Sequence, residues 1–128
     1  MKELTKAEEQ VMQVLWQIEK GFVNDILEHY NDPKPAYNTV STIVRILEKK
    51  GFVGHKSYGK THQYYPLMTK KEYAQKFFKG FMKNYLSNSY HALASFLTND
   101  KNISLKDLEE MKNLMESEID KQKSGYNE

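Results

Sequence analysis

The sequence predicts a mainly α-helical protein with a small β-ribbon, organised as a winged helix-turn-helix head followed by a C-terminal helical region. Three observations predict this fold class. Three amphipathic stretches fill roughly the first fifty residues, two short strand-like stretches flank a Gly-containing turn, and a long helical pattern completes the chain. Three small helices followed by a hairpin are typical of a winged helix. We therefore place a domain boundary between residues 1–68 and 69–128.

The first helix is expected to begin after Thr5, because Thr5 and Glu8 have the spacing of a capping box. Gly21 is expected to end it. A second, shorter helix should follow and stop before the prolines at 33 and 35. Both helices carry apolar residues at helical spacing: Val11, Val14, Leu15 and Ile18 in the first, and Val23, Ile26, Leu27 and Tyr30 in the second.

The third helix is predicted from about Asn38 to Lys50, with Asn38 as a plausible cap and Gly51 as the residue that stops it. Its apolar stripe should face a core, and this stripe consists of Val40, Ile43, Val44 and Leu47.

Two strands, 52–57 and 62–67, are expected to form a hairpin around a turn containing Gly59. Pro66 suits the end of an edge strand. This hairpin would be the wing of the predicted fold.

The C-terminal region begins with a second capping box at Thr69 and Glu72, and one long helix is predicted from Lys70 to about Leu97. A last helix, capped by Ser104, follows a polar loop. Two helices cannot enclose the aromatic and aliphatic residues that they carry, so we expect them to pair with a second copy of the chain, although packing back on the head remains open. The residues proposed for this pairing are Phe77, Phe81, Tyr85, Leu108, Met111 and Met115.

The overall composition excludes several classes of protein. There is no cysteine, which excludes disulfides and thiolate metal sites. No apolar run is long enough for membrane insertion, and the charged start lacks the apolar core of a secretory signal, so a cytoplasmic protein is expected. The four histidines lack metal-ligand spacing, and no phosphate-binding loop or nucleophile-and-base order is present. We predict neither an enzyme nor a cofactor or metal.

Charge is distributed unevenly along the chain. Residues 34–71 contain eight basic side chains against one acidic, a net charge of +7, whereas residues 1–33 carry −4 and residues 99–128 carry −3. A basic centre between acidic flanks favours a surface for a polyanion, although an accidental bias of solvated residues remains open.

The outer face of the third helix has no acidic residue and many hydrogen-bonding side chains, which suits the major groove of DNA. Lysines on the hairpin would contact phosphates. His55 and His62 are more simply explained as ordinary surface residues. The predicted DNA-binding residues are Asn38, Thr39, Ser41, Thr42, Arg45, Lys49, Lys56 and Lys60.

Several motifs resemble those of the penicillinase-repressor (BlaI/MecI) family. The opening Leu4-Thr5-x-Ala7-Glu8 is followed by Val11-Met12 and Leu15-Trp16, the third helix contains Thr39-Val40-x-Thr42, and the wing reads Gly59-Lys60-x-x-x-Tyr64-x-Pro66. The resemblance covers residues 4–68 well and the C-terminal helices more weakly. Glu9 and Ile46 depart from it, at positions where the family commonly has an aromatic residue and an arginine.

The resemblance implies a repressor that binds a dyad operator in double-stranded DNA as a homodimer. It further implies dimerisation through the C-terminal helices and inactivation by proteolysis there, triggered by a membrane sensor-protease. The nearest match to the family's cleaved bond is Ser95-Phe96. A copper-responsive branch of the family uses C-terminal cysteines, which this chain lacks.

One alternative stays open, because winged helices also serve as protein-interaction modules that bind no DNA. The basic wing and the acid-free face of the third helix favour DNA.

Overall fold

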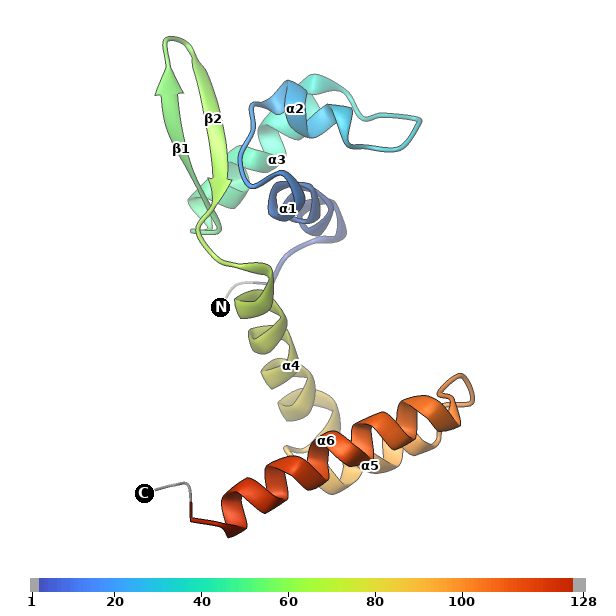
Figure 1. Ribbon diagram of the computed structural model, residues 1–128. Helices are drawn as coiled ribbons and strands as arrows, with labels where there is room; N and C mark the ends of the chain where they lie inside the picture. The colour runs from blue at the N-terminus through green and yellow to red at the C-terminus, as the bar shows by residue number, and fades with distance from the viewer. Residues whose placement is uncertain (1–2, 126–128) are drawn as a thin grey trace. The chain divides into compact units, whose positions relative to one another are not determined.

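The computed structural model describes residues 3–125 and divides the chain into two compact units, Met1–Lys79 and Gly80–Glu128. We call the first unit the head and the second the C-terminal unit. The boundary falls within the fourth helix. The elements are α1 (Lys6–Ile18), α2 (Val23–Glu28), α3 (Tyr37–Lys49), β1 (Val53–Tyr58), β2 (Thr61–Pro66), α4 (Lys70–Leu86), α5 (Tyr90–Thr98) and α6 (Leu105–Lys123) (Figure 1).

Three helices and a two-stranded antiparallel ribbon form the head, which confirms the predicted winged helix (Figure 1). The ribbon pairs Val53 with Pro66 at its base and Tyr58 with Thr61 at its tip. The apolar stripes of α1, α2 and α3 meet the base of the ribbon in a single core. It consists of Val11, Met12, Val14, Leu15, Val23, Ile26, Val40, Val44, Leu47, Phe52, Val53 and Tyr64.

Gly21 does not end α1, as the sequence had suggested. The helix stops at Ile18, and Glu19 adopts a positive φ of 73° as its cap. Gly21 instead pairs with Tyr64 of β2, through backbone hydrogen bonds of 2.9 and 2.8 Å. A Cβ atom on Gly21 would lie 2.8 Å from Cδ1 of Ile18, so this close approach explains the glycine.

The prediction that Asn38 caps α3 is also wrong. The helix begins at Tyr37, after Ala36 as the N-cap residue, so Asn38 is a helical residue with an exposed side chain. The side-chain amide of Asn38 therefore does not cap the helix. The prediction that Gly51 follows the end of α3 is confirmed. Its φ of 87° is the left-handed conformation that commonly ends a helix.

Both predicted capping boxes are present. Thr5 accepts a hydrogen bond from the Glu8 amide at 3.1 Å, and the Glu8 carboxylate accepts one from the Thr5 amide at 2.9 Å. The same reciprocal pair joins Thr69 and Glu72 at 3.0 and 2.8 Å. These bonds satisfy amides that have no partner inside the helix.

Glu8 also forms a nearly buried ion pair. Its Oε1 lies 2.7 Å from Nζ of Lys50, which follows α3. Burial by itself raises the pKa of Glu8, but the hydrogen bonds from Lys50 and Thr5 outweigh it and lower that pKa overall. Lys50 therefore ties α3 to α1.

The C-terminal unit contains a break that the sequence analysis missed. A single helix to about Leu97 was predicted, but α4 ends at Leu86 and α5 begins at Tyr90. Ser87 and Asn88 both adopt positive φ, of 51° and 59°, and the Asn88 amide donates to the Met82 carbonyl. Ser89 then caps α5. The left-handed residues end α4, and the Ser89 hydroxyl starts α5 by accepting from the Ala92 amide at 3.0 Å.

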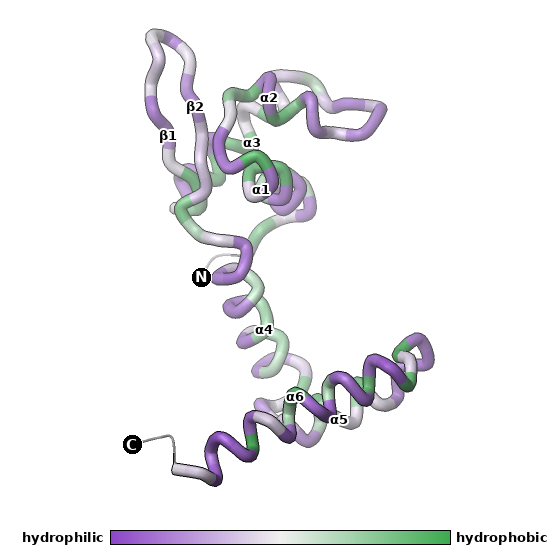
Figure 2. The backbone as a smooth tube through the Cα atoms, in the orientation of Figure 1, coloured by the Kyte–Doolittle hydropathy of each residue, from purple (hydrophilic) through white to green (hydrophobic). Residues whose placement is uncertain are grey.

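The helices of the C-terminal unit carry apolar side chains that find little cover. In residues 80–125, Met82 alone is a buried apolar side chain, whereas Leu105 and Leu114 are 73% and 72% exposed. Hydrophobic and hydrophilic residues alternate along α6 (Figure 2). None of the helices within residues 3–125 combines the length and the apolar character that crossing a bilayer requires.

Candidate nucleic-acid interface

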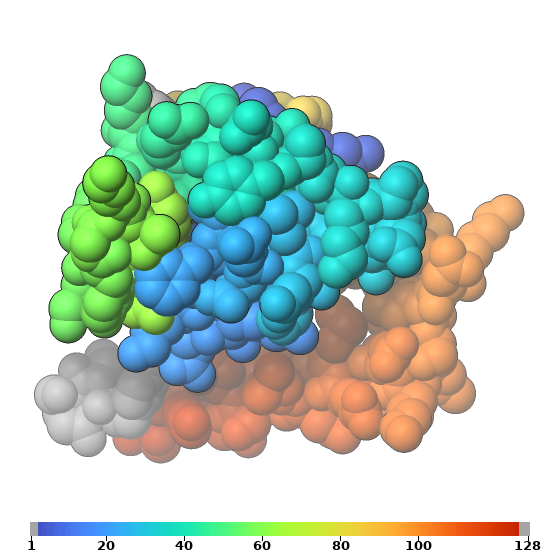
Figure 3. Space-filling model, turned by 90° about the horizontal axis from the view of Figure 1, so that it is seen from above, coloured from blue at the N-terminus to red at the C-terminus, as the bar shows by residue number. Residues whose placement is uncertain are grey.

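We call the two-stranded ribbon of β1 and β2 the wing. One face of the head is formed by α2, α3 and this wing. Figure 3 looks onto this face, where the green wing lies beside the blue α2 and the teal α3. Val40, Val44 and Leu47 are completely buried, so the rotation of α3 is fixed and its opposite side must face solvent. The packing of α3 on the core therefore determines which of its residues are exposed to solvent on this face.

Arg45 is the single arginine of the sequence and lies exposed on α3. Its Nε donates to the Ser41 carbonyl at 3.3 Å, and Nη2 lies 3.5 Å from the Thr42 hydroxyl. These contacts are long and solvent-exposed, so they cost little to give up. The guanidinium is thus available for a bidentate contact with guanine or a phosphate.

A groove of ≈ 490 Å³ brings three of the predicted residues together. Ser41 and Arg45 line it from α3, and Lys60 lines it from the tip of the wing. The same groove is lined by residues that the sequence analysis did not select: Asn24 of α2, Tyr37 of α3 and Thr61 of β2. All of these side chains can donate hydrogen bonds to phosphate or base edges.

Tyr37 could have been found from its spacing. It lies four residues before Ser41 and eight before Arg45, so the three share one helical stripe. Its ring is 48% exposed. It was overlooked because the helix was expected to begin one residue later. Asn24 carries no such signal, since only folding brings α2 beside α3.

The wing tip is a tight turn. Gly59 adopts a φ of 64°, and the Thr61 hydroxyl donates to the Tyr58 carbonyl at 2.9 Å. The turn leaves Lys60 exposed beside the groove. Lys56 lies over the Tyr58 ring, 5.4 Å from its centroid, where a cation–π contact supports it.

Asp25 lines the groove, and its carboxylate and that of Glu48 both have contacts within the head. The Asp25 carboxylate accepts from the Phe22 amide at 2.9 Å. Glu48 contacts Nδ1 of His55 at 2.5 Å, and the His55 ring stacks on His62 with centroids 4.0 Å apart. The groove lining thus combines two basic side chains, Arg45 and Lys60, with one acidic side chain, Asp25.

Tyr64 lies beneath the groove and closes its floor. Burial raises the pKa of its phenol, and the nearby charge of Glu48 raises it further. Within residues 3–125, no cluster of three or more His, Asp or Glu side chains could hold a metal ion.

The remaining predicted DNA-binding residues lie on the head outside the lining of this groove. All are exposed: Asn38, Thr39, Thr42, Lys49 and Lys56. Lys50, by contrast, is held by Glu8 and is removed from the basic surface.

The residues predicted for dimerisation lie in two settings. Phe77, Tyr85 and Met115 are exposed, whereas Phe81, Leu108 and Met111 are half-buried. The Phe81 ring meets those of Tyr85 and Phe96, at centroid distances of 5.8 Å in each case.

Ser95 and Phe96 lie inside α5 rather than in a loop. The Ser95 carbonyl accepts from the Asn99 amide at 3.1 Å, so its peptide group belongs to the regular helix. A protease could cut this bond only after local unwinding.

Comparison with known proteins relates the chain to a family of repressors. Residues 4–117 match the family described as penicillinase repressor. The methicillin resistance regulatory protein MecI of Staphylococcus aureus (strain N315) is 27% identical over 114 residues, covering 88% of this chain and 93% of the relative. The MecI protein of Mammaliicoccus sciuri is 26% identical with the same coverage. The solution structure of the DNA-binding domain of the repressor BlaI covers 57% of this chain and 94% of its own, with a TM-score of 0.48 and 26% identity.

Proposed function

The chain belongs to the penicillinase-repressor family and is a DNA-binding transcriptional repressor of the BlaI/MecI type, and from this premise we propose that it binds a dyad operator as a homodimer. In this proposal residues 1–68 bind double-stranded DNA and residues 69–128 dimerise. The matched relatives are regulatory proteins, in agreement with the expectation that the chain is not an enzyme.

The observation that carries the DNA-binding proposal is the groove lined by Ser41, Arg45 and Lys60. Arg45 and Ser41 would read base edges from α3 in the major groove, and Lys60 would hold a phosphate from the wing. Tyr37 and Thr61 would add hydrogen bonds to the backbone. The remaining exposed residues of the predicted set (Asn38, Thr39, Thr42, Lys49 and Lys56) would extend the same surface.

The homodimer is supported by the uncovered apolar side chains of the C-terminal unit. Side chains such as Tyr85, Leu114 and Met115 are 76%, 72% and 58% exposed, which is unusual for a monomer. A second copy of the same helices offers the same apolar residues, so a two-fold interface covers both sets at once. Phe77, Phe81, Leu108 and Met111 would join it.

We propose that proteolysis in the C-terminal region inactivates the repressor, with a membrane sensor-protease as the partner. Loss of the helices would separate the two heads without changing the DNA-reading residues. Ser95-Phe96 is the candidate bond, and its place inside α5 means that cleavage must await unwinding of that helix.

The test is a binding selection followed by quantitative titration. Wild-type protein would be used to select duplexes from a random-sequence pool, and binding to the selected duplex would be followed by fluorescence anisotropy at several salt concentrations. We expect two-fold symmetric sites, half-sites about one helical turn apart, and affinity that falls steeply with salt. Selection of no sequence at low salt would contradict the proposal and favour a protein-interaction module.

A further inference from the structure

The first turns of α4 are held against α1 by a small group of side chains inside the head. The Tyr73 hydroxyl donates to Oε2 of Glu9 at 2.8 Å, across 64 positions of sequence. The Tyr73 ring also packs against Trp16 and Phe52, with centroids 5.6 and 6.2 Å away. A tyrosine of the C-terminal helical region is therefore part of the head.

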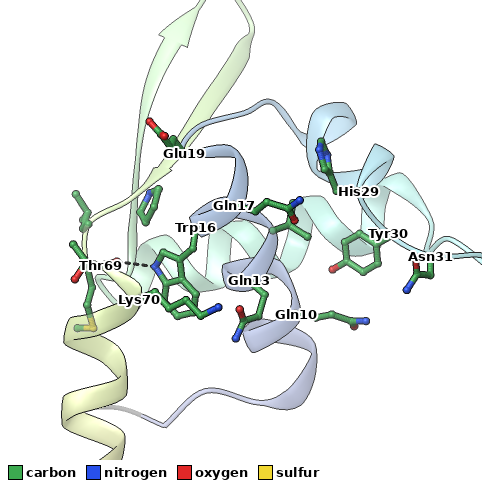
Figure 4. Close-up of a pocket in the computed structure, with 14 residues that line it drawn as sticks. Gln10, Gln13, Trp16, Gln17, Glu19, His29, Tyr30, Asn31, Thr69 and Lys70 are labelled. Carbon is green, nitrogen blue, oxygen red and sulfur yellow. Dashed lines mark hydrogen bonds between the residues drawn. The ribbon is translucent and has the colours of Figure 1, made fainter. Parts of the chain in front are cut away.

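Trp16 fixes the chain one step earlier. Its indole Nε1 donates to the Met68 carbonyl at 2.8 Å, immediately before the Thr69 cap of α4 (Figure 4). Trp16 also packs against the core of the head on one side and lines a cavity of ≈ 810 Å³ on another. Two side chains of α1, Glu9 and Trp16, thus hold consecutive points on the chain that leaves the wing.

We propose that Glu9, Trp16 and Tyr73 form a latch that fixes the start of α4 on the head and thereby sets how strictly the homodimer distinguishes operators of different half-site spacing. The effect on operator spacing rests on the proposed function. Glu9, Trp16 and Tyr73 are positioning residues, because none of them lines the groove that would contact DNA.

The physical reason lies in the pitch of DNA. One added or removed base pair between half-sites rotates one head relative to the other by roughly 35° about the duplex axis. A dimer whose heads are rigidly joined to their helices must strain to follow this rotation, whereas a loosened joint follows it easily. A latch of directed hydrogen bonds gives this rigidity, because it fixes direction as well as distance.

The first experiment needs no DNA. Full-length Tyr73→Phe removes the hydroxyl and keeps the ring, and hydrogen exchange would report on the amides of residues 74–79. We expect exchange there to become about tenfold faster, the effect of losing a hydrogen bond to a charged group. Tyr30→Phe, at another half-buried tyrosine of the head, is the matched control and should leave these amides unchanged. Equal exchange in Tyr73→Phe and the control would overturn the latch.

Glu9 variants separate the hydrogen bond from a general loss of stability. Glu9→Ala should speed exchange of the same amides as much as Tyr73→Phe, whereas Glu9→Gln keeps an acceptor oxygen and should speed it less. The double variant Glu9→Ala with Tyr73→Phe should be no faster than either single variant. Additive effects in the double variant would mean that the two side chains act separately.

A spectroscopic signature completes the test. Burial, and then the hydrogen bond to Glu9, raises the pKa of Tyr73 to about 12. In an alkaline absorbance titration, Tyr73→Phe should therefore lack the phenol that titrates near pH 12 in the wild type. Glu9→Ala should lower the pKa of that phenol. An unchanged high-pH titration in Glu9→Ala would contradict the contact.

The functional arm uses the duplex selected by the wild-type protein, with one base pair added to or removed from the spacer. The ratio of affinities for the cognate and altered spacers should fall roughly three- to tenfold in Tyr73→Phe, and it should not change in Tyr30→Phe. An unchanged ratio despite faster exchange would overturn the positioning role. If the wild type selects no dyad, the proposed function fails, and the exchange experiment still decides whether the latch exists.

Discussion

In the head, Val11, Met12 and Leu15 of α1 are completely buried. In the C-terminal unit, Leu114 and Met115 of α6 are 72% and 58% exposed. The head brings three helices and a ribbon around one core, so each apolar stripe finds a partner within the same chain. The helices of the C-terminal unit show apolar residues at similar spacing, but residues 80–125 bury a single apolar side chain. The comparison teaches that amphipathic spacing predicts that a face will be covered, and does not say by which molecule.

The largest effect is expected when the chain is ended after Lys79, which removes the C-terminal unit and keeps the head. The cut keeps Tyr73 and its contacts with Glu9 and Trp16, which a cut before residue 69 would remove. We expect a folded head that binds one half-site with unchanged affinity and the full dyad about 10²–10⁴-fold more weakly, because the second contact is no longer intramolecular. Circular dichroism and anisotropy would measure both. Full affinity for the dyad would refute dimerisation through the C-terminal unit.

A charge in the C-terminal unit should dissociate the dimer and spare the head. Met115→Glu would bury an unpaired carboxylate in the proposed interface, and a cost of about 3 kcal/mol weakens self-association roughly a hundredfold. Sedimentation equilibrium would measure it. Ser117→Glu adds the same charge at another exposed position of α6 and is the control. Equal dissociation by both variants would remove Met115 from the interface.

The corresponding change in the head should spare the dimer and impair reading of DNA. Arg45→Ala removes the only guanidinium of the chain, and we expect a loss of about 10–100-fold on the selected duplex with relaxed preference at one base pair per half-site. A binding selection on the variant would measure preference. Unchanged affinity and preference would show that α3 is not the reading element.

Lys60→Ala should have a smaller and less selective effect. A phosphate contact adds affinity for every sequence, so we expect a few-fold loss on specific and random duplexes alike. The slope of log affinity against log salt should become shallower by about one contact per head. Lys121→Ala, an exposed lysine near the end of α6, is the matched control. A loss confined to the selected duplex would contradict a phosphate role for the wing.

The smallest effect is a pH response confined to the head. The pKa of Glu8 is lowered in the folded protein, so its ion pair with Lys50 stabilises the head above the ordinary value of 4.5. That contribution should be lost as pH falls through the lowered pKa. Glu8→Gln should therefore unfold more easily at neutral pH and respond less to acid. Urea unfolding of the head at several pH values would measure this, and an equal acid response in both proteins would contradict it.

Local sequence patterns determined most of the elements. Reciprocal capping at Thr5 and Glu8, the stop at Gly51 and the buried stripe of α3 all depend on residues a few positions apart, so they could be predicted. Arg45 and Lys60 could be selected as candidate contacts because helical spacing and turn chemistry expose them.

Features that depend on distant residues came from the tertiary structure. Gly21 looks like a helix stop in the sequence, and only the approach of Tyr64 makes it a strand partner. The break at Ser87 and Asn88 depends on two residues with positive φ, which apolar spacing does not reveal. The pairing of Glu9 with Tyr73 joins residues 64 positions apart. Short-range patterns constrain which side of an element is buried, whereas the partner of that side is chosen by the packing of the whole unit.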